Sequence, residues 1–198
     1  MIGGMPALPL PRRRVCAQLL ALGLLPSGAL HAASLPPQVR QALRESGLVL
    51  MLRHAQTDPG VGDPPGFRLG QCSTQRNLSA AGREQSRRIG EQLRALQLTP
   101  HVVRSSAWCR CTETAELAFG KAERWPPLNS FFESRRDEPA QTAELRRMLA
   151  RPWPGHVEAW VTHMVNIAAL TGQGVAMGEL LVLARGGPTP QQLLRLAV

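Results

Sequence analysis

The sequence predicts an α/β domain of three layers, in which a mostly parallel sheet lies between two layers of helices. Short apolar runs alternate with segments of helical periodicity from residue 35 onward, and this alternation favours a parallel sheet covered on both faces. Residues 48–52 (LVLML) form a continuous apolar run, typical of a strand buried on both faces. The length of 198 residues, with 43% hydrophobic and 19% charged residues, suits a single such domain.

In the first half of the domain, each element is marked by its boundary residues. Two prolines open the helix expected over 35–46, and Gly47 ends it before the strand 48–52. The density of Pro and Gly over 59–70 predicts a long loop directly behind that strand. Ser79 is the expected N-cap of a helix that runs to residue 96.

The second half continues the alternation. The expected elements are a strand over 101–106, a helix over 107–120 that ends at Gly120, a loop-rich segment over 121–140, a helix that ends before Pro152, a strand over 157–163, a helix over 164–174, a strand over 178–185 and a short C-terminal helix.

The first 32 residues predict a secretory signal rather than a part of the domain. Three arginines at positions 12–14 precede an apolar run over 15–25, and small residues follow up to a cleavage site after Ala32. The apolar run is well short of the ~20 residues that a membrane span needs. We therefore expect a signal peptide over 1–32, a domain over 33–198, and a periplasmic or secreted protein without a stable membrane span. A buried N-terminal helix or a retained anchor are the alternatives.

The charge of the chain favours small anionic partners over nucleic acid. The formal net charge is +9, and the basic residues are almost all arginines, with Lys121 the only lysine. They are scattered rather than clustered, and aromatic residues make up only 4% of the chain. A nucleic-acid interface would show basic tracts and stacking aromatics, so we expect none.

Three cysteines remain once residues 1–32 are removed, namely Cys72, Cys109 and Cys111. In an oxidising compartment, three cysteines predict one disulfide and one thiol. Cys109 and Cys111 are too close in sequence to bridge each other comfortably, so Cys72 is expected to pair with one of them. A lone C-x-C with scattered histidines does not predict a zinc site, and we expect neither a metal nor a cofactor.

Basic side chains follow three of the predicted strands. Arg53 and His54 end the first strand, Arg110 lies just beyond the second, and His163 ends the third. Because the carboxyl ends of parallel strands share one edge of a sheet, these side chains can meet in one crevice. Two arginines and two histidines in one crevice predict an anion site.

At these residues the sequence resembles the histidine phosphatase superfamily, the phosphoglycerate-mutase-like enzymes. Residues 52–58 (LRHAQTD) resemble its "RHG" signature, with Ala55 at the glycine position. Residues 105–118 (SSAWCRCTETAELA) resemble its second block, whose characteristic positions are here Ser106, Arg110, Thr114 and Ala115. Residues 160–172 (WVTHMVNIAALTG) are similar to the third block, which carries His163, and the resemblance as a whole covers residues 48–185.

The resemblance implies a role for each of these residues. His54 is expected to be the nucleophile, because a neutral imidazole keeps a free lone pair at neutral pH. Arg53 and Arg110 would bind the phosphate oxygens through their planar guanidinium forks. His163 would donate a hydrogen bond to the same oxygens.

A proton donor for the leaving group is also needed, and a carboxylic acid is the natural choice. In the phytase-like branch the acid directly follows the second histidine, but here Met164 occupies that position. In the mutase-like branch the acid lies on the loop after the second block, which corresponds to residues 128–138. Glu133 is the expected donor, and Asp137 is the second candidate.

The sequence thus predicts an exported, metal-independent phosphomonoesterase that acts on a small phosphorylated substrate. The resemblance is greatest to the small periplasmic branch of the superfamily, which suggests an envelope sugar phosphate as the substrate. Two alternatives remain open: a non-catalytic module that binds phosphate or a phosphorylated envelope glycan, and a phosphomutase. The sequence does not indicate the oligomeric state.

Overall fold

The computed structural model of the chain describes residues 1, 3, 35–60 and 62–197, so the signal peptide expected over 1–32 lies outside them apart from residues 1 and 3. The α/β domain belongs to the unit His31–Val198. Its helices are α1 (Pro37–Glu45), α2 (Ala80–Ala95), α3 (Cys109–Phe119), α4 (Glu138–Leu149) and α5 (Met164–Thr171). Its strands are β1 (Leu48–Arg53), β2 (Val102–Ser105), β3 (Glu123–Arg124), β4 (Val157–Thr162), β5 (Leu180–Ala184) and β6 (Gln191–Leu196). Within the described residues, we find no helix with the length and apolarity that a membrane crossing requires.

The strands of the described chain form one sheet in the order β3-β2-β4-β1-β5-β6. β1 pairs in parallel with β4, and β2 pairs in parallel with both β3 and β4. β5 runs antiparallel to β1 and to β6. The prediction of a mostly parallel sheet is confirmed.

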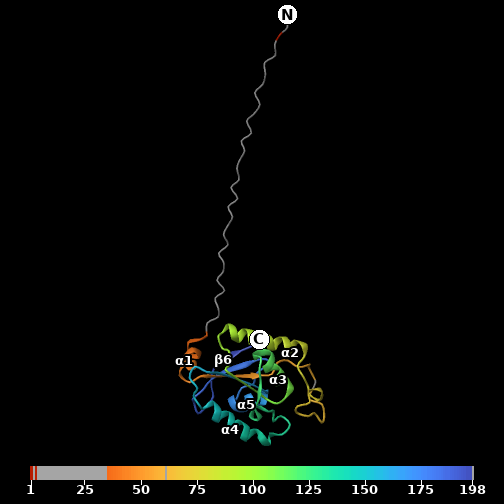
Figure 1. Ribbon diagram of the computed structural model, residues 1–198, viewed down its shortest axis with the longest axis vertical. Helices are drawn as coiled ribbons and strands as arrows, with labels where there is room; N and C mark the ends of the chain where they lie inside the picture. The colour runs from red at the N-terminus through yellow and green to blue at the C-terminus, as the bar shows by residue number, and fades with distance from the viewer. Residues whose placement is uncertain (2, 4–34, 61, 198) are drawn as a thin grey trace. The chain divides into compact units, whose positions relative to one another are not determined.

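Helices cover both faces of this sheet, as the alternation of elements predicted. Leu48, Leu50 and Leu52 of β1 pack in a cluster with side chains of α1, α2 and α3. Val49 and Met51, which point to the other face, pack with side chains of α4 and α5. Figure 1 shows α2 and α4 on opposite sides of the sheet. The strand is buried on both faces, which explains its continuous apolar sequence.

Several helix ends follow the local signals in the sequence. The Ser79 hydroxyl accepts a hydrogen bond from the Gly82 amide and so caps α2. Gly120 and Gly172 end α3 and α5 with φ values of 77° and 74°, a left-handed conformation that glycine adopts without steric cost.

Two features of the sheet differ from the expectation. The C-terminal residues form β6 instead of a short helix, because the edge of β5 offers unpaired backbone groups and Leu193, Leu194 and Leu196 pack against the core from this position. The short strand β3 lies in the segment that was expected to be only loop-rich. It pairs at just two positions with β2, too few for a sequence pattern to show.

The register between β1 and β4 positions the two predicted histidines. Arg53 lies opposite Thr162, and the His54 amide donates to the Thr162 carbonyl at 3.0 Å. The Ser106 amide, directly after β2, donates to the Val161 carbonyl at 2.9 Å. The residues that follow β1, β2 and β4 therefore leave the sheet together at one edge.

Candidate active site

A cavity of about 760 Å³ lies at this edge of the sheet. Its lining includes every residue that the sequence singled out for the site, namely Arg53, His54, Arg110, Glu133, Asp137 and His163. The structure therefore brings together residues that are up to 110 positions apart in the chain. Their chemical roles remain predictions.

His54 is buried, with 2% of its surface exposed, and its ring is oriented by its own chain segment. Its Nδ1 donates a hydrogen bond to the Ala55 carbonyl at 2.9 Å, since a carbonyl can only accept. In the neutral ring this leaves Nε2 with the lone pair. Burial lowers the pKa of His54 to about 3, and the positive charges of Arg110, Arg53 and Arg76 add to this effect. The hydrogen bond to Ala55 alone acts to raise the pKa. His54 is therefore a neutral imidazole at physiological pH.

The backbone that follows His54 is fixed by two neighbouring helices. The Ala55 amide donates to the Thr114 hydroxyl of α3 at 3.0 Å, and this hydroxyl in turn donates to the Arg110 carbonyl at 2.6 Å. On the α2 side, Gly82 lies so close that a Cβ there would be 1.9 Å from the Gln56 carbonyl oxygen. Thr114 and Gly82 therefore hold the segment that carries His54 in place.

His163 lies beside His54, with 5.5 Å between the ring centroids. Its Nε2 is 2.9 Å from the Ser106 hydroxyl and 3.4 Å from the Cys111 sulfur. These contacts occupy the Nε2 side of the ring. Burial, followed by interaction with His54 and with the arginines, lowers the pKa of His163 well below its ordinary value.

Three guanidinium groups surround the histidines, from Arg53, Arg76 and Arg110. The Arg53 Nη1 donates to the Val175 carbonyl at 2.8 Å, while its buried Nε has no hydrogen-bond partner in the described protein. Burial, and then the charges of the other arginines, lowers the pKa of both Arg53 and Arg76. Such crowding of like charges is relieved when an anion binds between them.

Asp63 supplies a negative charge inside this cavity. Its Oδ1 accepts a hydrogen bond from the Arg110 Nη1 at 2.9 Å and another from the Arg76 amide at 2.9 Å. The side chain is only 13% exposed, and that of Arg110 only 4%. The carboxylate thus holds Arg110 in a defined position, and this ion pair is well shielded from solvent.

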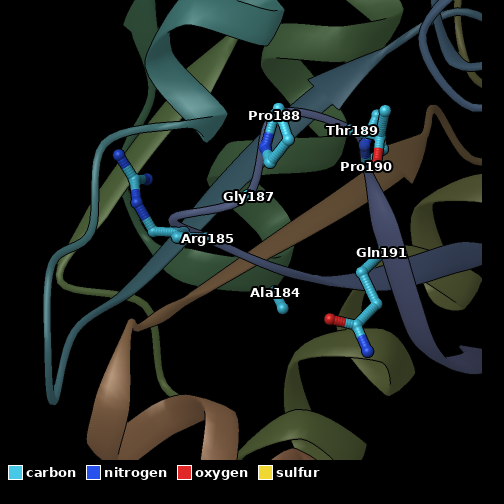
Figure 2. A pocket seen from close by; sticks show the side chains of 7 residues that line it. All are labelled: Ala184, Arg185, Gly187, Pro188, Thr189, Pro190 and Gln191. Atoms are coloured by element: carbon cyan, nitrogen blue, oxygen red, sulfur yellow. The ribbon is translucent and has the colours of Figure 1, made fainter.

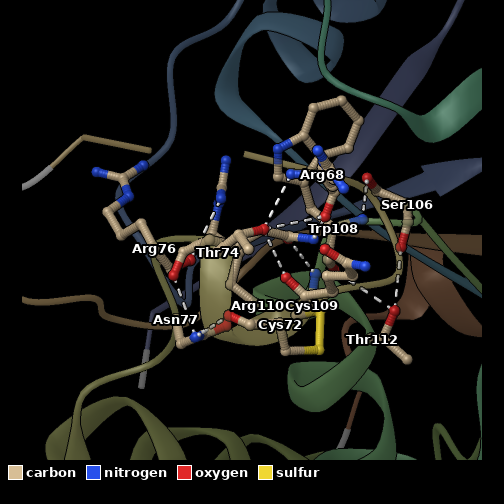
Figure 3. Close-up of a disulfide and its surroundings, with 12 residues drawn as sticks. Arg68, Cys72, Thr74, Arg76, Asn77, Ser106, Trp108, Cys109, Arg110 and Thr112 are labelled. Carbon is tan, nitrogen blue, oxygen red and sulfur yellow. Dashed lines mark hydrogen bonds between the residues drawn. A yellow bond between two sulfur atoms is a disulfide. The ribbon is translucent and has the colours of Figure 1, made fainter. Parts of the chain in front are cut away.

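A disulfide between Cys72 and Cys109 fastens the loop that carries Asp63 to the start of α3, as Figure 3 shows. The Cα atoms of the two cysteines are 5.6 Å apart. The Gln75 side chain supports the same contact, because its Oε1 accepts from the Cys109 amide at 2.9 Å. The expected single disulfide from Cys72 is confirmed, and Cys109 is its partner.

Among the described cysteines, Cys111 is the one with a free thiol, and it is buried next to His163. Burial raises the pKa of this thiol to about 12. Since a protonated thiol is a poor nucleophile, Cys111 does not compete with His54 for an electrophile.

The two candidate acids, Glu133 and Asp137, both lie on the segment between β3 and α4 and both are exposed at the cavity. The structure does not separate them by burial. Among the described residues, no group of three or more His, Cys, Asp or Glu side chains is placed to hold a metal ion.

The sequence interpretation missed Arg76, Asp63 and Trp108, which also line the cavity. Asp63 and Arg76 lie in the long loop behind β1, where no strand end or spacing rule marks them. Trp108 directly precedes α3. Its ring meets the His163 ring edge to face, at 5.3 Å between the centroids. Its position within the second block could have indicated a place in the site.

A second cavity, of about 370 Å³, lies at the other end of β1, where β5 turns into β6 (Figure 2). Ala184 lines this cavity and pairs with Leu48, the first residue of β1. The Arg185 guanidinium is bound on all three nitrogens: to the Arg151 and Met148 carbonyls and to the Glu158 carboxylate. This arginine therefore serves the fold rather than a ligand.

Comparison with known proteins agrees with this geometry. Residues 49–130 match the family model described as histidine phosphatase superfamily (branch 1). No curated protein matches the chain.

Several solved structures share the fold. The protein histidine phosphatase SixA, solved in complex with tungstate, is 16% identical with a TM-score of 0.54, covering 76% of this chain and 96% of SixA. The product of open reading frame Rv3214 from Mycobacterium tuberculosis is 17% identical with a TM-score of 0.57. The match covers 74% of this chain and 95% of the Rv3214 chain. The mycobacterial glucosyl-3-phosphoglycerate phosphatase Rv2419c is 19% identical with a TM-score of 0.50. The match covers 71% of this chain and 90% of the Rv2419c chain. At these identities the likeness establishes the fold.

The lowered pKa of His54 predicts a loss of stability in mild acid. The unfolded chain binds a proton at this histidine near pH 6.5, whereas the native protein binds it only near pH 3. Between these values the unfolded state holds more protons, so the free energy of unfolding falls as the pH falls, by about 1.4 kcal/mol per pH unit for this group below pH 6. His163 acts in the same direction. Urea unfolding at pH 7, 6 and 5 should show a smaller pH slope for His54→Asn than for the wild type. Equal slopes would contradict this assignment.

Proposed function

We propose that this chain is a phosphomonoesterase of the histidine phosphatase superfamily that forms a phosphohistidine on His54. Residues 49–130 match the family model, and the solved neighbours share the fold. One observation carries the proposal. The neutral His54, oriented through Nδ1 by the Ala55 carbonyl, lies in one cavity with His163, Arg53 and Arg110. The comparisons support the broader statement that the chain has phosphatase or mutase-like activity.

In the first step, His54 Nε2 attacks the phosphorus atom and the bond to the leaving oxygen breaks. A carboxylic acid, Glu133 or Asp137, donates its proton to this oxygen, and the alcohol leaves. In the second step, water attacks the phosphorus, the P–N bond breaks, and the same carboxylate takes up the proton of the water. The products are the alcohol and inorganic phosphate, and His54 is restored.

The arginines supply the positive charge that this reaction needs. Arg53, Arg76 and Arg110 are placed to oppose the charge that spreads over the phosphoryl oxygens in the transition state. This stabilisation requires no metal ion, and we propose that the activity is metal-independent. A bound phosphate would also compete with Asp63 for the Nη1 of Arg110.

The substrate is a small phosphorylated molecule. The cavity, at about 760 Å³, accommodates a ligand of that size. A phosphomutase would use the same first step but would transfer the phosphoryl group to a second alcohol instead of water. A binding module would hold the phosphate without forming the P–N bond.

The first test is hydrolysis of 4-nitrophenyl phosphate by the full chain in the presence of a chelator. We expect turnover by the wild type and a loss of at least about a thousandfold in His54→Ala, because the variant lacks the imidazole that is proposed to form the covalent intermediate. Protein denatured in alkaline detergent, which preserves the acid-labile P–N bond, should carry a phosphoramidate on the wild type alone. Binding of inorganic phosphate without any turnover would instead establish the binding module, and transfer to an added alcohol in preference to water would establish the mutase.

The second test identifies the proton donor by comparing Glu133→Gln with Asp137→Asn. A proton donor matters most for a poor leaving group, so its loss should lower kcat by about a hundredfold on benzyl phosphate and far less on 4-nitrophenyl phosphate. We expect this pattern in Glu133→Gln, with Asp137→Asn as the matched control on the same loop. The reverse pattern would assign the role to Asp137, and two unaffected variants would exclude this loop as the source of the proton.

We also propose that the protein is exported and cleaved after Ala32. The order of arginines, apolar run and small residues over 1–32 supports this, and a disulfide such as Cys72–Cys109 persists in an oxidising compartment. Mass spectrometry of the protein from fractionated cells should find a chain that begins at Ala33 outside the cytoplasm. A cytoplasmic chain that retains residues 1–32 would overturn the proposal.

A further inference from the structure

We propose that the substrate is a phosphomonoester of an apolar alcohol, whose hydrocarbon part lies on an apolar rim of the catalytic cavity. This inference rests on the proposed phosphatase function and replaces the sugar phosphate expected from the sequence. The apolar rim is defined by the side chains that line the cavity beside the arginines and histidines: Phe67, Leu69, Trp108, Phe132, Met164 and Val165.

Exposed apolar side chains of the described domain gather at this rim. Between residues 35 and 197, four large apolar side chains are exposed, and three of them line the cavity: Leu69 at 47%, Phe132 at 77% and Met164 at 42%. Single exposed apolar residues are common on protein surfaces, but a contiguous group around a cavity indicates a ligand or partner. The fourth, Trp153, stacks on His156 and does not line this cavity.

The rim is built from separate segments that meet only at the cavity. Phe67 and Leu69 belong to the loop fastened by the disulfide, and Phe132 belongs to the segment before α4. Met164 is the first residue of α5 and directly follows His163, so it lies next to the proposed phosphate-binding residues. In the inner part of the rim the rings pack on one another: the Phe67 and Trp108 centroids are 5.9 Å apart, and the Trp108 ring contacts the His163 ring.

The position of the rim favours the leaving group as its occupant. The phosphoryl group is held among the arginines, and the remainder of a small substrate must extend from there towards the cavity mouth. The hydroxyl groups of a sugar would lose water against this surface without gaining partners there, which is costly. A hydrocarbon group gains from the same contact. The polar residues at the mouth, Ser130, Glu133, Ser134 and Asp137, lie on the segment that carries the candidate acids.

The test compares n-hexyl phosphate with glucose 6-phosphate. Both are six-carbon esters of a primary alcohol, so their leaving groups have similar reactivity and differ mainly in polarity. We expect kcat/KM to be at least about tenfold higher for n-hexyl phosphate, since each buried methylene contributes to binding. Benzyl phosphate, also a primary ester, shows whether the rim prefers an aromatic to an aliphatic group. Equal or higher kcat/KM for glucose 6-phosphate would overturn the inference but would leave the phosphatase function standing.

A variant pair tests the rim itself. In the double variant Phe132→Ser/Met164→Ser, the ratio of kcat/KM for n-hexyl phosphate to that for glucose 6-phosphate should fall by about tenfold. Trp153→Ser, which removes an exposed apolar side chain outside the cavity, is the matched control and should keep the wild-type ratio. An unchanged ratio in the folded double variant would overturn the role of the rim. Absence of turnover on all three esters and on 4-nitrophenyl phosphate would instead reject the phosphatase function.

Discussion

The parallel pairing of β1 with β4 is the constraint on which the site depends. Its register sets Arg53 opposite Thr162, so the next residue of each strand is a histidine. The hydrogen bond from the His54 amide to the Thr162 carbonyl extends this pairing by one residue into the cavity. A slip of either strand by one residue would turn the side chains of that strand, and so its histidine, to the opposite face. The buried apolar clusters on both sides of the sheet make such a slip costly, so core packing also fixes the catalytic geometry.

The charged side chains of the site lie around two uncharged histidine rings. Burial keeps both histidines uncharged, and the nearby arginines add to this effect. The same cations that would attract a phosphate therefore also maintain the lone pair of His54. Asp63 offsets part of the positive charge while the site is without a ligand. The site thus stores electrostatic repulsion that a doubly charged phosphate relieves, which favours selective capture of anions.

The sequence was sufficient for those parts of the fold and site that depend on local patterns. The layers follow from the alternation of apolar runs, and the basic residues of the phosphate pocket are recognisable because each lies close behind a strand. Asp63 and Arg76 were not predictable in this way, because contacts with distant residues determine the path of their loop.

The cysteine pairing stayed open for a related reason. Only the packing of α3 shows that Cys109 faces the loop while Cys111 faces His163. At the C-terminus, tertiary pairing with β5 overrode a helical pattern.

The covalent link between Cys72 and Cys109 also separates two evolutionary demands on this molecule. Arg53, His54 and His163 lie at strand ends, where core packing tolerates little change. The loop that contributes Phe67 and Leu69 is anchored by a bond that does not depend on its other residues. Mutations of Phe67 or Leu69 can therefore alter the surface of the cavity without displacing His54. A lineage carrying such a link can acquire new substrates by exchanging a few loop side chains while its catalytic framework stays the same.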